Sequence, residues 1–237
     1  MKRLAVTLLV AAAALIPAVA ATSASPGKVV AKRDWTRVVA ITPEGGFRMG
    51  NPGAGVKLVE YGSLACPHCR HFEETGFKPL LQSYVRTGRV SYEFRNLLIN
   101  GPDLSVSLLT RCSGTGGFFP MSQYVFATQP DWMKKIEDIG SADKAALDQM
   151  TDQQRVIRYA EIAGMAPMAA RFGVTPARAK QCLVDPKGLK RLLDMTQAAM
   201  SAGVEHTPTF IVNGKMIDAA SWEGLEPELK SALGERR

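Results

Sequence analysis

The chain has 237 residues, of which 46% are hydrophobic and 22% are charged, and its formal net charge at pH 7 is +7. This apolar fraction fits a globular fold, and the length allows one domain of ordinary size with an insertion. The basic residues form scattered groups with acids between them, without a basic stripe and interleaved aromatics. We therefore expect no nucleic-acid binding.

The N-terminal residues have the layout of a secretory signal peptide. Lys2 and Arg3 precede an apolar, alanine-rich stretch over residues 4–20 that ends in Ala18-Val19-Ala20. We expect cleavage near Ala20 and a periplasmic location, with the net charge falling to +5 because residues 1–20 contain no acid. The alternative is an uncleaved membrane anchor, against which the short run and Pro17 argue.

Residues 21–51 are expected to form an irregular N-terminal extension. One short strand is predicted over residues 38–41, and it is followed by Gly45-Gly46 and Gly50-Asn51-Pro52-Gly53. Turn residues at this density indicate loop rather than regular structure.

A strand, a helix and a second strand are predicted next. Strands are expected over residues 56–61 and 90–95, and a helix over residues 70–86 with a kink at Pro79. This order indicates a right-handed parallel unit.

Helix signals dominate from residue 102 to residue 203. Asp103, Thr151, Thr175 and Asp185 mark expected helix starts, and Gly203 marks the last end. We therefore predict an all-helical insertion over residues 101–202.

The final elements are a β-hairpin and a helix. Strand-type residues 209–212 and 215–217 flank Asn213-Gly214, and a helix over residues 221–233 is expected to bend or split at Pro227. Strands thus lie on both sides of the helical insertion.

Cys66-Pro67-His68-Cys69 carries the clearest chemical signal. Two cysteines at this spacing can open and close a small disulfide ring. The predicted helix places Cys66 at its N-terminus, where unpaired N–H groups and the helix dipole favour a thiolate. His68 can add a positive charge or a hydrogen-bond donor. These effects stabilise the reduced form and make the disulfide oxidising.

The remaining cysteines, Cys112 and Cys182, both fall in the helical insertion. Four cysteines in an exported protein form an even set, and oxidising compartments let disulfides persist. We expect a structural disulfide between them. Two buried free thiols are the alternative, because sequence does not fix connectivity.

The arrangement of these parts resembles the DsbA-type thiol:disulfide oxidoreductases of the thioredoxin superfamily. The resemblance rests on the Cys-Pro-His-Cys motif behind a strand, the helical insertion, and Thr207-Pro208-Thr209-Phe210 before the hairpin, and it spans nearly all of residues 52–235. It implies an α/β fold, a thioredoxin fold with an inserted all-helical domain. Residues 52–100 and 203–237 would form the discontinuous thioredoxin-like domain.

The resemblance also implies roles for individual residues. Pro208 would be a cis-proline beside the disulfide, and the backbone of Thr207 would bind an extended substrate chain. The alternative is an ordinary loop proline. Glu60 looks like a buried acid that relays the proton of Cys69 when Cys69 attacks a mixed disulfide, and Glu73 resembles another family acid position. For Glu73 the alternative is a solvated helix face, and for Glu60 it is a purely structural role.

Two histidines fit the pattern less closely. His206 stands where the resemblance leads us to expect a small residue. It could bring a second titratable ring near the sulfurs and the bound substrate, or be a polar loop residue. His71 is expected on the helix surface.

Metal and haem chemistry are the main competing interpretations. Zinc needs four ligands, and Cys66, Cys69 and one histidine leave a gap that no second motif fills. Attachment of c-type haem needs histidine after the second cysteine, but position 70 is Arg70. We expect no cofactor beyond the redox disulfide, with a metal-binding module as the alternative.

Within redox chemistry, we expect an oxidase that introduces disulfides into reduced exported proteins. The resemblance implies a membrane quinone-linked oxidase, similar to DsbB, as the reoxidant. Isomerases of this superfamily commonly dimerise through an N-terminal domain, whereas a short segment precedes residue 56, so a monomer is expected. An isomerase or reductase is the alternative.

Overall fold

A computed structural model describes residues 33–235. The signal peptide expected over residues 1–20 lies outside this range. None of the helices in the described range combines the length and the apolarity that a membrane crossing requires.

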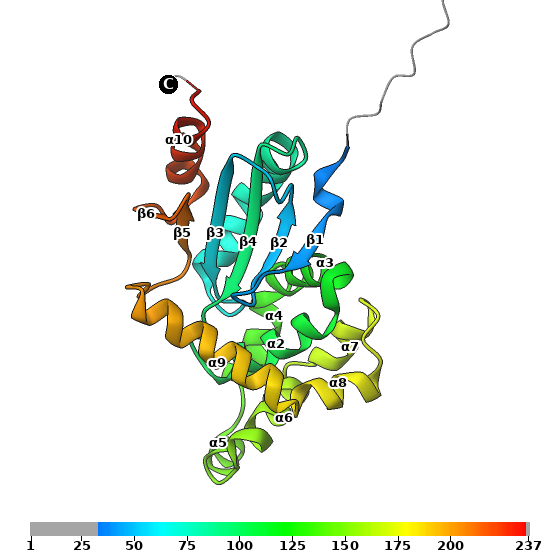
Figure 1. Cartoon of the computed structure of the whole chain (residues 1–237). Coiled ribbons are helices and arrows are strands. Elements are labelled where there is room, and N and C mark those ends of the chain that lie inside the picture. Colours follow the sequence, from blue (N-terminus) through cyan, green and yellow to red (C-terminus); the bar gives the residue numbers. More distant parts are fainter. Residues whose placement is uncertain (1–32, 236–237) are drawn as a thin grey trace, which may run out of the picture. The chain divides into compact units, whose positions relative to one another are not determined.

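The centre of the fold is a six-stranded sheet with the strand order β1-β2-β4-β3-β5-β6 (Figure 1). The central strands β3 and β4 are parallel, and all other neighbours are antiparallel. The strands are β1 (Val39–Ile41), β2 (Phe47–Gly50), β3 (Val56–Gly62), β4 (Val90–Asn96), β5 (Thr209–Val212) and β6 (Lys215–Ile217). The predicted parallel pairing of the strands on either side of the Cys66 helix is confirmed.

The helical connection between β3 and β4 is less regular than predicted. It begins as α1 (Pro67–Phe72) and continues as two π-helical segments, Glu73–Phe77 and Leu80–Val85, with Pro79 between them. Proline has no backbone N–H to donate, so the hydrogen-bond pattern changes at Pro79, although its backbone angles stay helical. The apolar face of this helical connection packs into the core, where Phe72, Phe77 and Leu80 are fully buried.

The N-terminal segment is more regular than the sequence suggests. Residues 39–41 and 47–50 form β1 and β2, and β2 pairs with β4 in register from Phe47–Phe94 to Gly50–Ser91. The short strand predicted over residues 38–41 is confirmed by β1, whereas the loop expected over residues 47–50 is wrong because β2 forms there. The pairing covers an edge of β4 and buries Phe47 and Met49 in the core.

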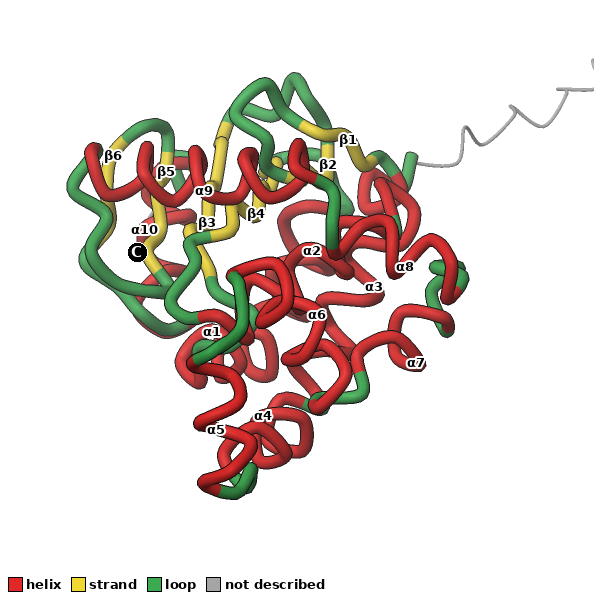
Figure 2. Tube along the Cα trace, turned by 90° about the horizontal axis from the view of Figure 1, so that it is seen from below, coloured by secondary structure: helices red, strands yellow, loops and turns green. Residues whose placement is uncertain are grey.

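Eight helices follow between β4 and β5 in the described range. They are α2 (Gly101–Cys112), α3 (Gly114–Ala127), α4 (Gln129–Glu137), α5 (Ser141–Asp148), α6 (Asp152–Ile162), α7 (Met165–Ala170), α8 (Pro176–Leu183) and α9 (Pro186–Ser201). Figures 1 and 2 show α2 to α8 gathered in one group, from which α9 leads back to β5.

The predicted starts of three of these helices are confirmed. The side chains of Thr151, Thr175 and Asp185 cap α6, α8 and α9 by accepting hydrogen bonds from backbone N–H groups of the first turn. The start expected at Asp103 is wrong. Asn100 caps α2, and Asp103 is buried within it.

The hairpin and the last helix form as predicted. Asn213 and Gly214 have positive φ angles of 49° and 83°, which the two-residue turn between β5 and β6 requires. Helix α10 (Trp222–Ala232) contains Pro227 without being split.

One hydrophobic core runs through both the sheet and the helices. The ring of Phe47 in β2 stacks on Phe118 in α3, with centroids 3.8 Å apart. Because the packing is shared in this way, the division into a thioredoxin-like domain and a helical insertion stays a prediction.

Candidate active site

Cys66 lies at the N-terminus of α1, as predicted from the sequence. It is the residue before the first helical position, and Pro67 occupies that position, where a missing N–H costs nothing. Both cysteines of the motif are free thiols, with 5% of Cys66 and 1% of Cys69 exposed. Cys66 is therefore the outer and Cys69 the inner sulfur.

The two thiols have opposite acidities. Hydrogen bonding to Cys69 lowers the pKa of Cys66 from 9.0 to about 5, against the opposing effect of burial, and Thr207 and the backbone N–H groups of Cys69 and His68 add to the lowering. Burial, then hydrogen bonding to Cys66, raises the pKa of Cys69 well above its ordinary value. At neutral pH the pair is a Cys66 thiolate beside a Cys69 thiol.

His68 takes part through its backbone. Its side chain is exposed at the rim of the site, whereas its N–H is one of the groups that lower the pKa of Cys66. His71, further along α1, is also exposed, as expected.

The segment before β5 reaches the sulfur of Cys66. Antiparallel pairing of Tyr61 with Thr209 brings the start of β5 to the end of β3. The Thr207–Pro208 peptide bond is cis, as the resemblance implies, and the Sγ atom of Cys66 lies 3.3 Å from the carbonyl oxygen of Thr207. His206 is exposed, and its carbonyl oxygen accepts a hydrogen bond from the Thr209 hydroxyl.

Glu60 is buried beneath the two cysteines, with 2% of its surface exposed. The hydroxyl of Tyr92 donates a hydrogen bond of 2.6 Å to its Oε2 atom. Burial raises the pKa of Glu60 to about 8, while the Tyr92 hydrogen bond opposes the rise and the charge of Cys66 adds to it. A Cβ atom on Gly62 would lie 2.5 Å from the buried ring of Phe94 and 2.9 Å from Oε1 of Glu60, so a glycine is needed here.

Glu73 shares this electrostatic environment. It is half-buried rather than on a fully solvated helix face. Burial, and then the charge of Glu60, raises the pKa of Glu73 to about 8, with a hydrogen bond to Gln123 acting in the opposite direction. Glu60, which interacts with the charge of Cys66, and Glu73, which interacts with Glu60, are therefore both mostly protonated at neutral pH.

Two residues of the helices hold the loop that leads to Cys66, and the sequence analysis missed both roles. Asp103 in α2 accepts hydrogen bonds from the Ser63 hydroxyl at 2.7 Å and from the Leu64 N–H at 3.1 Å. The Nε2 atom of Gln129 in α4 donates to the carbonyl oxygens of Leu64 and Cys66, at 2.9 and 3.1 Å. Both side chains are buried, and no local pattern distinguishes them in the sequence.

The other two cysteines form a disulfide away from this site. It joins Cys112 at the end of α2 to Cys182 in α8, with a Cα–Cα distance of 6.1 Å. Within residues 33–235, no group of three or more histidine, cysteine or acidic side chains is placed to hold a metal ion.

The pairing of a low-pKa thiolate with a cis-proline segment is accompanied by a family match. The family model described as Thioredoxin matches residues 42–231. The chain belongs to the thioredoxin family. The mixed sheet with its helical segment between β4 and β5 also agrees with the fold expected from the resemblance.

Relatives of this thioredoxin-family chain include a Rickettsia bellii protein named "Putative protein-disulfide oxidoreductase". The two are 28% identical over 193 residues, which cover 80% of this chain and 65% of the relative. A Rickettsia conorii protein with the same description is 26% identical over 80% of this chain and 61% of its own length. The chain thus spans less than two thirds of the length of these relatives.

Solved structures are also similar to this chain. A protein-disulfide isomerase from Novosphingobium aromaticivorans is similar with a TM-score of 0.75 and 27% identity, over 79% of this chain and 97% of that one. Wolbachia pipientis alpha-DsbA1 is similar in fold, with a TM-score of 0.62 and 19% identity over 79% and 90% of the two chains.

Proposed function

We propose that this protein is a periplasmic thiol:disulfide oxidoreductase that introduces disulfides into reduced exported proteins. The observation that carries the proposal is the pair formed by the Cys66 thiolate and the buried Cys69 thiol. A thiolate with a pKa near 5 is a good leaving group, and its stability favours the reduced protein over the oxidised one. A disulfide between these sulfurs is therefore readily donated.

The reaction proceeds in two exchanges. A substrate thiolate attacks the Sγ atom of Cys66 in the oxidised protein, the Cys66–Cys69 bond breaks, and its electron pair goes to Cys69. A second substrate thiolate then attacks the substrate sulfur of the mixed disulfide and releases the Cys66 thiolate. The substrate loses two electrons, and the protein gains them as a dithiol.

Glu60 supplies the proton that the first exchange requires. The Cys69 sulfur that leaves is buried and has a raised pKa, so it is released as a thiol. The neutral carboxyl of Glu60, whose pKa is about 8, is the acid beneath it, and Glu73 is a second carboxyl in the same state.

The substrate chain lies beside Thr207. Its carbonyl oxygen is 3.3 Å from the Cys66 sulfur, so an extended substrate that pairs with the backbone of Thr207 brings its own sulfur to the site of exchange. Pro208 is buried, whereas His206 and His68 are exposed and open to a substrate chain.

The cellular setting of the proposal comes from the sequence. Residues 1–20 act as a cleaved signal peptide, and a membrane quinone-linked oxidase of the DsbB type restores the disulfide of the monomeric protein. The mass of the mature protein isolated from the periplasm tests cleavage near Ala20. Gel filtration tests the monomer.

An isomerase is the second candidate, because the similar structure from Novosphingobium aromaticivorans is described as a protein-disulfide isomerase. The two functions are separated by giving the protein a reduced test substrate and a scrambled one in parallel. An oxidase restores activity mainly to the reduced substrate, and an isomerase mainly to the scrambled one. The Cys66→Ala variant is the control. If this variant were as active as the wild type on either substrate, the proposed chemistry would be wrong.

A further inference from the structure

A cavity of about 400 Å³ lies between β2, the end of α2, α8 and the start of α9, and its lining includes none of the residues assigned to the candidate active site. Phe47 and Leu108 form an apolar wall, and the Cys112–Cys182 disulfide forms another part of the lining. Four of the lining side chains are cationic, namely Arg111, Arg178, Lys187 and Arg191.

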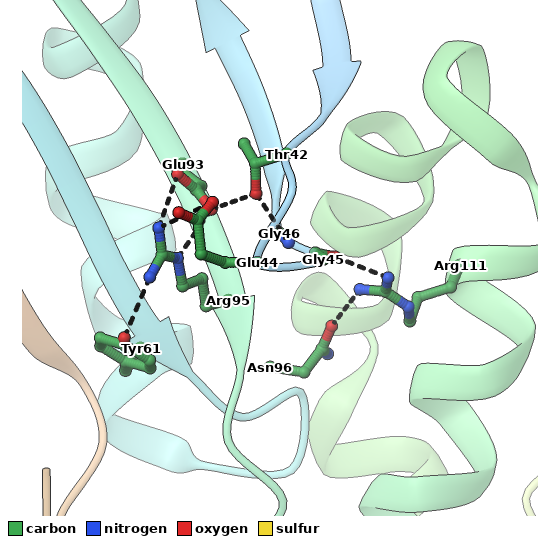
Figure 3. A network of polar contacts seen from close by, with 9 residues as sticks. All are labelled: Thr42, Glu44, Gly45, Gly46, Tyr61, Glu93, Arg95, Asn96 and Arg111. Atoms are coloured by element: carbon green, nitrogen blue, oxygen red, sulfur yellow. Dashed lines mark hydrogen bonds and ion pairs between the residues drawn. The ribbon is translucent and has the colours of Figure 1, made fainter. Parts of the chain in front are cut away.

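Arg111 is the most enclosed of the four cations and has only neutral partners. Its guanidinium donates hydrogen bonds to Oδ1 of Asn96 at 3.0 Å and to the carbonyl oxygen of Gly45 at 2.7 Å (Figure 3). The Cζ atom also lies 4.9 Å from the centroid of the Phe47 ring. A partly buried charge without a counter-charge is costly, so the site is electrostatically incomplete.

The other three cations of the cavity also have no counter-charge among the described residues. Within residues 33–235, none of Arg178, Lys187 and Arg191 forms an ion pair. The one carboxylate in the lining is Asp185, and its two oxygens accept hydrogen bonds from the N–H groups of Lys187 and Gly188. It is thus committed to capping α9.

A neighbouring cavity is lined by two further cations, and both of these have a carboxylate partner. That cavity shares Lys187 and Arg191 but is also lined by Lys190 and Arg95. Lys190 pairs with Asp194 at 2.6 Å, and Arg95 pairs with Glu93 at 2.7 Å. Lys187 and Arg191, which line both cavities, have no such carboxylate partner in the described part of the chain.

The cations of the first cavity are close enough to repel one another. A Cβ atom on Gly45 would lie 3.4 Å from Cγ of Arg191, so Arg191 runs beside the same backbone that Arg111 binds. Burial, and then the charge of Arg191, lowers the pKa of Arg111 to about 10.

We propose that this cavity binds a phosphate group, either as inorganic phosphate or as the phosphomonoester of a small organic molecule. A dianion offsets the excess of several positive charges better than a single carboxylate, and arginine side chains present paired N–H donors that match phosphate oxygens. The volume is in the range of small-molecule sites.

The test uses the full chain and titrates sodium phosphate, glycerol 3-phosphate and sodium chloride at matched ionic strength, with calorimetry and thermal unfolding as readouts. Saturable binding of phosphate, accompanied by a rise in Tm that chloride does not produce, is expected. Tighter binding of glycerol 3-phosphate identifies an ester as the ligand, and equal or weaker binding identifies free phosphate.

Charge-removing variants locate the site. Arg191→Gln and Lys187→Gln should each weaken phosphate binding about tenfold or more, because each removes a charge-assisted contact. Lys190→Gln is the matched control, since it removes the same charge one position away on α9 but outside this cavity. These lysine and arginine side chains are exposed, so the variants should fold, which circular dichroism checks. The absence of saturable binding, or equal binding by all three variants, would overturn the proposal.

Discussion

The sulfur of Cys66 lies 3.3 Å from the carbonyl oxygen of Thr207, although 141 positions separate the two residues in the sequence. The contact joins the outer thiol at the start of α1 to the backbone segment that leads into β5. The proposed attack on the sulfur and the proposed alignment of a substrate chain therefore coincide at one point. The acidity of the Cys66 thiol is the property on which the proposed function depends most directly.

The ultraviolet absorbance of the Cys66 thiolate should titrate with a pKa near 5 in the reduced protein, compared with 9.0 for an ordinary thiol. Hydrogen bonds from the side chains of Cys69 and Thr207 are the main physical cause. Reduced Cys66→Ala protein is the control and should lose this transition. A transition near the ordinary value in the wild type would contradict the mechanism.

The same acidity makes the stability of the reduced protein depend on pH. The pKa of Cys66 is lower in the folded than in the unfolded state, so its stabilisation is complete above the unfolded pKa and is lost as the pH falls through about 5. Near neutral pH it should amount to about 3 kcal/mol. Urea unfolding of reduced protein and of the reduced Cys66→Ala variant, at neutral and at acidic pH, measures the difference.

The two cysteines should behave differently when each is replaced by serine. In Cys69→Ser the Cys66 thiolate attacks a disulfide of a scrambled test substrate, and the mixed disulfide persists because no inner thiol resolves it. In Cys66→Ser the remaining thiol is 1% exposed and protonated, so no adduct should form. Non-reducing gels score the adducts, and equal trapping by both variants would reverse our assignment of roles.

Changes at Glu60 should appear in the pH profile of substrate oxidation. Glu60→Gln removes the buried acid and should slow the release of Cys69 about 100-fold. Tyr92→Phe removes a hydrogen bond that lowers the pKa of Glu60, so that pKa should rise further above about 8 and the alkaline limb of the rate should move to higher pH. Glu137→Gln, at an exposed position of α4, should leave the profile unchanged.

Gln129→Leu should destabilise the protein by about 1–3 kcal/mol, because two carbonyl oxygens of the active-site loop lose their donor in a buried setting. Chemical unfolding measures the change. Gln149→Leu, at an exposed position, should alter stability by less than about 0.5 kcal/mol. Similar stabilities of the two variants would show that the Gln129 contacts are not made in solution.

Removal of the disulfide with Cys112→Ala and Cys182→Ala together should lower the free energy of unfolding by about 4 kcal/mol, since the bond closes a loop with a sequence separation of 70. Substrate oxidation should persist at temperatures where the variant is folded, because the bond lies outside the reactive site. Thiol counting on denatured, unreduced wild type should find neither cysteine free.

Much of the fold was predictable because its signals are local. The Cys66 motif, the hairpin turn at Asn213-Gly214 and the caps at Thr151 and Asp185 each depend on residues a few positions apart. Strand β2 (Phe47–Gly50) was missed because it has only four residues, follows a glycine and ends in one. Its pairing with β4, distant in sequence, determines its conformation.

The support of the active-site loop was missed for a similar reason. Asp103 lies 39 positions from Leu64, and Gln129 lies 63 positions from Cys66. Asp103 also has the appearance of a helix cap, and its true role follows only from the packing of α2 against the loop. Burial, which raises the pKa values of Glu60 and Glu73, is likewise a property of the folded chain rather than of any short motif.

The strand order places β1 and β6 at the two margins of the sheet, and each has only three residues. Edge strands this short offer few unpaired N–H and C=O groups to a strand of another chain. For a protein proposed to meet unfolded chains continually, this limits adhesion by strand addition. Encounters with such chains are then directed to the sulfur and the segment beside it, from which they can dissociate once exchange is complete.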